Sequence, residues 1–281
     1  MHLSPIVSVD WLAKHLGDPD LRVVDATWYM PAENRPGLAE FQAGHIPGAV
    51  FFDIDQIADR SSDLPHMLPP PDDFAREAAA LGLHPDDRIV VYDGHGIFSA
   101  PRVWWTLRVM GFTQVAVLDG GLKAWRAAGH AVETGDPAPR PSQSEARLQS
   151  HLVRDLGQVR DALEAPDIQV LDARPAGRFS GAAPEPRPGL RGGHMPGACN
   201  LPWSAVVGPE GTLRSPDDLR AAFAAAGIDL QRPIITTCGS GVSAAVLTLA
   251  LARLGLDEVP IYDGSWSEWG GRPDTPIVTG P

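Results

Sequence analysis

The chain has 281 residues, of which 43% are hydrophobic and 21% charged, a composition typical of a globular protein with about two domains. Its formal net charge of −12 argues against nucleic acid or an anionic membrane surface as a partner, although a few arginines can still build a local site for a small anion. The sequence has no long apolar run, no signal-peptide pattern and only two cysteines, so we expect a cytoplasmic protein with free thiols and no membrane span.

Short β-rich runs alternate with helical stretches along the whole chain. The helical segments 71–82 and 215–227 begin with residues typical of a helix N-terminus and end on glycine. The β-rich runs are apolar on both faces, which is typical of buried parallel strands, so we expect an α/β fold with helices on both faces of each sheet. In chain order, the expected strands are 22–26, 88–93, 115–120, 168–173, 233–238 and 259–264.

Four sequence blocks occur twice, in the same order and about 145 positions apart. The pairs are VVDATW with VLDARP, FQAGHIPGAVFFD with LRGGHMPGACNLP, IVVYDGHG with IITTCGSG, and VLDGGLKAW with IYDGSWSEW. This repetition predicts two tandem copies of one domain, 1–132 and 151–281. Between them, 133–150 is polar and rich in Pro and Ser, so we expect an extended linker there.

The segment CGSGVS, beginning at Cys238, lies between a predicted strand and a helix predicted to begin at about Ser243. Gly239 and Gly241 allow the backbone to curl so that successive N–H groups form a nest for an anion. The start of the helix adds partial positive charge, and both effects favour a nucleophilic thiolate, or a persulfide carried on the same residue. The alternative for Cys238 is a buried structural cysteine beside a tight turn. Cys199 lies in an apolar, strand-like run, so we expect it to be structural.

The position of the first copy that matches Cys238 is occupied by Asp93, so we expect one active and one inactive domain. Phosphatases and arsenate enzymes with similar loops need an arginine six residues after the cysteine, to bind an oxyanion. Here that residue is Ala244, which argues against a thiol phosphatase, and no lysine follows the glycines as it would in a P-loop.

The doubled domain, the loop CGSGVSA and the motifs GHIPGAVFFDID, SDLPHMLP, DARPAGRF, PEPRPGLRGGHMPGA and YDGSWSEWG resemble the rhodanese superfamily. Within it, they are similar to the 3-mercaptopyruvate sulfurtransferases, because thiosulfate-using members carry basic residues where this loop has Gly239 and Ser240. One departure is Ser243, where the family usually has threonine. The resemblance implies two rhodanese-like domains and transfer of sulfur from 3-mercaptopyruvate, through a Cys238 persulfide, to a thiol acceptor such as thioredoxin or a small dithiol. It implies no metal and no organic cofactor.

The same resemblance suggests the site residues. Arg178 and Arg187 match substrate-binding arginines of the family, and a guanidinium suits the flat carboxylate of an α-keto acid. His66 and Asp55 match positions that work with Cys238 and Ser240, which implies a Ser240–His66–Asp55 relay in a cleft between the two copies. The loop residues expected to line the substrate site are Gly239, Gly241, Val242 and Ser243.

Other polar and aromatic residues of the repeats have structural interpretations. His45 and His194 recur in both copies, so we expect both to be structural, and Asp25 and Asp172 are expected to cap turns at strand ends. Arg174 is expected to hold the cysteine loop. The expected core tryptophans are Trp104, Trp105, Trp266 and Trp269.

Two alternative functions remain open from the sequence. One is a thiosulfate sulfurtransferase, against which the neutral residues of the cysteine loop argue. The other is a non-catalytic tandem binding module, against which the presence of Cys238 argues, because such modules usually lose the nucleophile in both copies.

Overall fold

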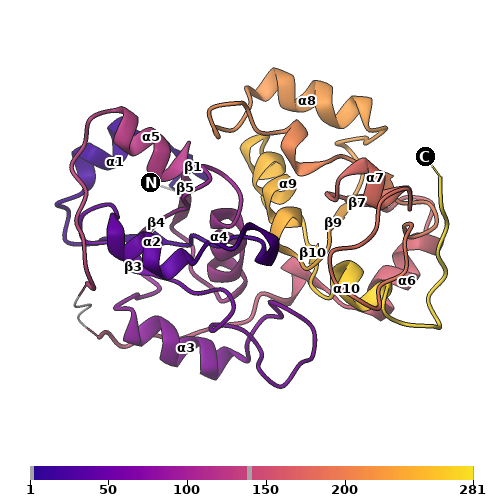
Figure 1. Cartoon of the computed structure of the whole chain (residues 1–281), viewed down its shortest axis with the longest axis horizontal. Coiled ribbons are helices and arrows are strands. Elements are labelled where there is room, and N and C mark those ends of the chain that lie inside the picture. The colour runs from indigo at the N-terminus through magenta and orange to yellow at the C-terminus, as the bar shows by residue number, and fades with distance from the viewer. Residues whose placement is uncertain (1–2, 138–140, 281) are drawn as a thin grey trace. The chain divides into compact units, whose positions relative to one another are not determined.

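The computed structural model describes residues 3–137 and 141–280, which form two compact units (Figure 1). The described residues of the first unit fall in Met1–Arg60, Leu68–Gln149 and Gly208–Leu213, and those of the second fall in Ser61–Met67, Ser150–Val207 and Arg214–Pro281. The units therefore follow the two repeats, except that each repeat contributes one short segment to the other unit. Residues 138–140 of the expected linker lie outside the described residues.

The first unit is built on a five-stranded sheet in the order β1-β5-β4-β2-β3, with every pairing parallel. Residues of β2 and β4 pair throughout, from Leu21 with Arg88 to Asp25 with Tyr92, so Asp25 and Asp93 lie at the carboxyl edge of the sheet. The strands are β1 (Ile6–Val7), β2 (Leu21–Asp25), β3 (Val50–Phe51), β4 (Arg88–Tyr92) and β5 (Val115–Leu118).

Helices of the first unit cover both faces of this sheet. One core cluster joins Val90 and Ala116 of the strands to Leu12, Phe41 and Trp125 of three helices. The alternate strand residues are also buried, and α4 packs against β4 and β5. The helices are α1 (Val9–His15), α2 (Gly37–Ala43), α3 (Pro71–Ala80), α4 (Ala100–Val109) and α5 (Gly121–Ala127), with a 3-10 turn at Pro31–Glu33.

The second unit repeats the design with a parallel sheet in the order β6-β10-β9-β7-β8. Strand by strand, this is the order of the first sheet, which confirms the duplicated α/β fold. The strands are β6 (Val153–Arg154), β7 (Gln169–Asp172), β8 (Cys199–Asn200), β9 (Ile234–Thr237) and β10 (Ile261–Tyr262). The helices are α6 (Leu156–Glu164), α7 (Ala176–Phe179), α8 (Pro216–Ala225), α9 (Val242–Arg253) and α10 (Ser265–Trp269), with 3-10 turns at Ser150–Leu152 and Trp203–Ala205.

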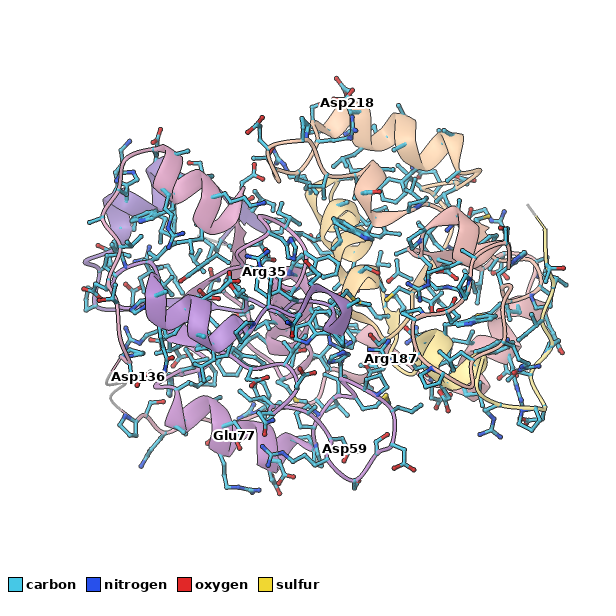
Figure 2. The ribbon with its side chains drawn as sticks, in the orientation of Figure 1. Arg35, Asp59, Glu77, Asp136, Arg187 and Asp218 are labelled. Atoms are coloured by element: carbon cyan, nitrogen blue, oxygen red, sulfur yellow. The ribbon has the colours of Figure 1, made fainter. Side chains whose placement is uncertain are left out.

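The matching helices α3 and α8 begin differently. Ser215 caps α8 through its side chain, which accepts a hydrogen bond from the Asp218 amide, as the sequence predicts. Helix α3 has no side-chain cap and begins at Pro71, whose fixed φ suits a first turn. Both helices are amphipathic, and Figure 2 shows the exposed Glu77 on α3 and Asp218 on α8. Within 3–137 and 141–280, no helix is both long and apolar enough to span a membrane.

Candidate active site

Cys238 directly follows β9 and so lies at the carboxyl edge of the second sheet, where ligands of parallel α/β sheets bind. Helix α9 begins at Val242, one residue before the predicted start, and Gly241 is its N-cap with φ 77°. A residue with a Cβ is strained in that left-handed region, so glycine is required there. Cys238 and Ser240 are buried, whereas Ser243 is half-buried.

The start of α10 anchors the cysteine loop. The Cys238 amide donates to Ser265 Oγ at 3.3 Å, and the Cys238 carbonyl accepts from the Trp266 amide at 2.9 Å. The Gly239 carbonyl accepts from both the amide and the hydroxyl of Ser267, at 2.9 and 2.7 Å. Trp266 was predicted as a core residue, whereas Ser265 and Ser267 were not predicted, although the repeated motif DGGL/DGSW marks this turn in both copies.

The matching loop of the first unit has its nest filled by a carboxylate. The side chain of Asp93 is fully buried and accepts five backbone N–H hydrogen bonds. Because the loop binds an anion of its own chain, its curl is an anion nest. The donors are His95 (2.9 Å) and Gly96 (2.8 Å) to Oδ1, and Phe98 (2.8 Å), Ser99 (2.9 Å) and Ala100 (2.8 Å) to Oδ2.

The sequence repeat relates this nest to the loop of Cys238. In the first unit the Asp93 carbonyl accepts from the Leu122 amide, as the Cys238 carbonyl accepts from Trp266, so the two loops are tied down in the same way. Cys238 therefore occupies, in the second loop, the position that Asp93 occupies in the first. By sequence position, the amides that match the five donors belong to Ser240, Gly241, Ser243, Ala244 and Ala245, of which the last three lie in the first turn of α9, whereas α4 begins only at Ala100.

Arg178 lies beside the cysteine loop at the end of α7. A Cβ added to Gly239 would lie 3.0 Å from Arg178 Nη2, so glycine at this position leaves room for the guanidinium. Its φ is not in the left-handed region, so the backbone conformation does not itself require glycine here. Arg178 Nε and Nη2 both donate to Glu185 Oε2, and Arg174 Nη1 donates to Glu185 Oε1 at 2.7 Å. The side chains of Arg174 and Glu185 are fully buried.

Arg174 is itself held at the carboxyl end of β7. It donates to Asp172 at 2.6 to 3.1 Å and to the Gly193 carbonyl at 2.9 Å, and its guanidinium lies 4.0 Å from the ring centre of Trp266. None of these partners belongs to the cysteine loop, which Arg174 was expected to hold, so that expectation stays a prediction. Glu185 was not singled out by the sequence analysis.

Three of the remaining predicted site residues, His66, Asp55 and Arg187, lie on loops. His66 is buried, has φ 61° and belongs to the second unit with Cys238. Asp55 is an exposed residue of the first unit, where its carboxylate accepts from the Trp28 indole at 2.9 Å. Arg187, labelled in Figure 2, is half-buried, and Val242 is the buried first residue of α9.

The residues interpreted as structural take such positions. His45 and His194 are buried, bond the carbonyls of Phe41 and Phe179 through Nδ1, and stack on those rings. Cys199 lies half-buried in β8. Asp25 and Asp172 each accept the backbone amide two residues later, as turn caps do, and the four predicted core tryptophans are buried.

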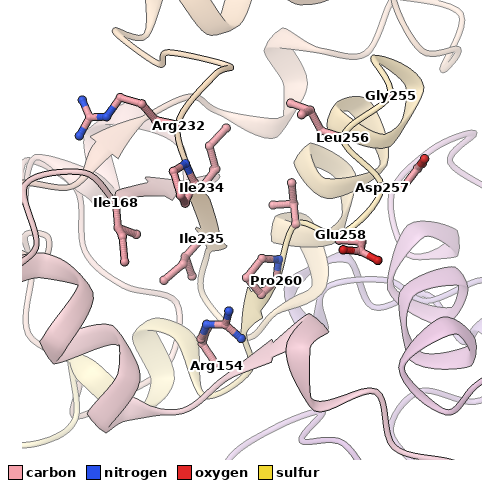
Figure 3. A pocket seen from close by; sticks show the side chains of 12 residues that line it. Arg154, Ile168, Arg232, Ile234, Ile235, Gly255, Leu256, Asp257, Glu258 and Pro260 are labelled. Carbon is pink, nitrogen blue, oxygen red and sulfur yellow. The ribbon is translucent and has the colours of Figure 1, made fainter.

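A cavity of about 600 Å³ lies elsewhere in the second unit (Figure 3). Its lining includes Ile168, Ile234 and Pro260, from the amino ends of β7, β9 and β10, with Arg154 and Glu258 at its sides. It contains none of the predicted site residues and lies at the edge of the sheet opposite to the cysteine loop. Within the described part of the chain, no three His, Cys, Asp or Glu side chains are grouped so that they could hold a metal ion.

Comparison with known proteins accounts for this arrangement. Residues 8–128 and 155–272 each match the model of the rhodanese-like domain. A relative from Arabidopsis thaliana, "Thiosulfate/3-mercaptopyruvate sulfurtransferase 1, mitochondrial", is 47% identical over 98% of this chain and 78% of its own length. The "3-mercaptopyruvate sulfurtransferase" of Escherichia coli is 46% identical over 99% of both chains, and that of Homo sapiens is 41% identical over 98% of this chain and 95% of its own.

Solved structures agree with these sequence matches. The crystal structure of SseA from Escherichia coli, described as a 3-mercaptopyruvate sulfotransferase with the rhodanese fold, superposes with a TM-score of 0.85 at 43% identity. The superposition covers 94% of this chain and 99% of that one. Since both halves match the domain model and the relatives align over nearly the whole length, the chain belongs to the rhodanese family.

Proposed function

We propose that this chain is a sulfurtransferase that moves sulfur from 3-mercaptopyruvate to a thiol acceptor through a persulfide on Cys238. The observation that carries the proposal is the anion nest of the first unit: the loop at the matching sequence position holds the Asp93 carboxylate with five backbone N–H groups. Arg178 beside Gly239 supplies a cation for the substrate carboxylate. The names of the relatives support the choice of donor.

The reaction has two displacement steps. The Cys238 thiolate attacks the sulfur of 3-mercaptopyruvate, an S–S bond forms, the C–S bond breaks, and its electron pair leaves with carbon as the enolate of pyruvate. A proton at that carbon completes pyruvate. An acceptor thiolate then attacks the outer sulfur and releases the Cys238 thiolate, which is covalent catalysis without a cofactor.

The chain's own residues have distinct tasks in this scheme. The nest stabilises the negative sulfur before and after transfer, and Arg178 and Arg187 bind the α-keto carboxylate. Ser240, acting with His66 and Asp55 as the family resemblance implies, delivers the proton to the enolate or polarises the keto group. The first domain is an inactive copy, because Asp93 replaces the nucleophile. For the setting we propose the cytoplasm, with thioredoxin or a small dithiol as acceptor.

Mass spectrometry of the intact protein tests the proposal directly. After incubation with 3-mercaptopyruvate and no acceptor, the chain gains the mass of one sulfur atom on the peptide that contains Cys238, and one pyruvate is released per chain. Cys199→Ser keeps this gain and Cys238→Ser loses it. Sulfur transfer that survives in Cys238→Ser refutes the mechanism. A higher kcat/KM for thiosulfate than for 3-mercaptopyruvate assigns the protein to the thiosulfate class instead.

A further inference from the structure

We propose that Glu185 is a positioning residue that holds Arg178 beside the cysteine loop, ready for the substrate carboxylate. This inference rests on the proposed function. Glu185 lies in the loop between α7 and β8, so no helix or strand sets the direction of its side chain. Its carboxylate is nevertheless fully buried, and each of its oxygens binds a different arginine.

One side of Glu185 is fixed to the sheet. Its Oε1 accepts from Arg174, which is bound in turn to Asp172 at the end of β7 and packed on the Trp266 ring. The first unit has Thr27 at the position that matches Arg174. The first unit also has Asp93 in place of the cysteine. Of the two copies, the one with the cysteine is therefore the one with the arginine anchor.

The other side of Glu185 directs Arg178. Both Nε and Nη2 of Arg178 donate to the same oxygen, Oε2, which fixes the plane of the guanidinium. Among the described residues, no hydrogen bond uses Nη1 of Arg178, so this nitrogen is left for a ligand. Holding the long side chain in place before substrate arrives removes an entropic cost of binding.

Positioning and simple charge make opposite predictions for Glu185→Gln. The cluster of Asp172, Arg174, Glu185 and Arg178 contains two negative and two positive side chains, so the substitution leaves one additional positive charge. If charge alone mattered, an anionic substrate would bind more tightly to the variant. If Glu185 positions Arg178, the anionic substrate binds less tightly, because a glutamine NH₂ now faces one of the two arginines.

Steady-state kinetics with 3-mercaptopyruvate measure the effect. We expect Glu185→Gln to raise KM about tenfold while kcat changes by less than about threefold. Glu185→Asp keeps the carboxylate and recovers part of the loss, and it carries the test if Glu185→Gln does not fold. In the Arg178→Ala background, Glu185→Gln has no further effect on KM. The matched control is Asp274→Asn, since Asp274 also bridges two arginines, Arg160 and Arg272, and its KM stays unchanged.

A second readout does not depend on the sulfur donor. In a Cys199→Ser background, Cys238 is alkylated with the anionic reagent iodoacetate and with the neutral reagent iodoacetamide. The rate with iodoacetate divided by the rate with iodoacetamide reports a cation near the sulfur. This ratio falls in Glu185→Gln as it does in Arg178→Ala. A KM equal to or below that of the parent protein, an unchanged or higher ratio, or an additive effect with Arg178→Ala overturns the inference. Failure of the parent protein to use 3-mercaptopyruvate, with the ratio still falling, refutes the proposed function alone.

Discussion

Replacing Asp93 by asparagine tests whether the loop is an anion nest. The carboxylate is fully buried and accepts five backbone N–H groups at 2.8 to 2.9 Å. The amide oxygen of asparagine can take over at most the three donors of one carboxylate oxygen, and its NH₂ group then faces at least two N–H groups. Since each buried donor left unsatisfied costs about 1–3 kcal/mol, we expect Asp93→Asn to lower the free energy of unfolding by about 3–5 kcal/mol.

The free energy of unfolding is measured by urea denaturation, and hydrogen exchange locates the loss. Because the two compact units can unfold separately, the amides of residues 95–100 are the informative probes. We expect their exchange in the variant to be faster than in the parent protein by a factor of about 100 to 4,000, which is the stated loss at 1.4 kcal/mol per tenfold. The matched control is Asp86→Asn, whose side chain is 92% exposed and whose substitution changes stability by less than about 0.5 kcal/mol.

The result that refutes the reasoning is a loss below about 1 kcal/mol in Asp93→Asn, with exchange unchanged at residues 95–100. The carboxylate would then not hold the loop. The comparison with Cys238, on which the stabilisation of a negative sulfur depends, would lose its physical basis.

Five further substitutions, at four residues, test three separate features. Burial raises the pKa of Asp25 from 3.8 to about 6, so the contribution of its protonated form to stability is present below pH 4 and lost as the pH rises through 6. Parallel denaturant titrations of the parent protein and of Asp25→Asn measure this: relative to the variant, the parent protein loses about 3 kcal/mol of unfolding free energy between pH 4 and pH 8. Gly241→Ala places a Cβ on a residue with positive φ and lowers the free energy of unfolding by about 1–3 kcal/mol. Gly239→Ala displaces only the end of the Arg178 side chain, so this variant has a higher KM for 3-mercaptopyruvate and a melting temperature within about 2 °C of that of the parent protein. Ser265→Ala and Ser265→Gly both lose the hydroxyl that accepts from the cysteine amide, but only alanine keeps a Cβ at the positive φ of 50°, so Ser265→Ala is less stable than Ser265→Gly by about 1 kcal/mol. Equal stability of these two variants contradicts strain at this residue.

Much of the fold could be predicted because it is encoded by residues close together in the chain. Each of the six predicted strands is present, since an apolar β-branched run indicates a buried strand whatever surrounds it. The four short strands β1, β3, β6 and β8 are not among those six. They have two residues each, which is too few for a periodic pattern, and they exist because their backbones pair with β5, β2, β10 and β7 respectively.

The sequence by itself determined the duplicated α/β fold, the rhodanese family and the cysteine at the turn from β9 to α9, because repeats, strand patterns and turn glycines are local features. Only the tertiary structure decided how the loop is supported. The hydrogen bond from the Cys238 amide to Ser265 joins two loops that are distant in the sequence. The Glu185 carboxylate lies in a loop without helix or strand and bridges Arg174 and Arg178. Such contacts depend on where packing brings separate segments together, and burial then makes each of them specific, since a charged or polar group removed from water needs a partner.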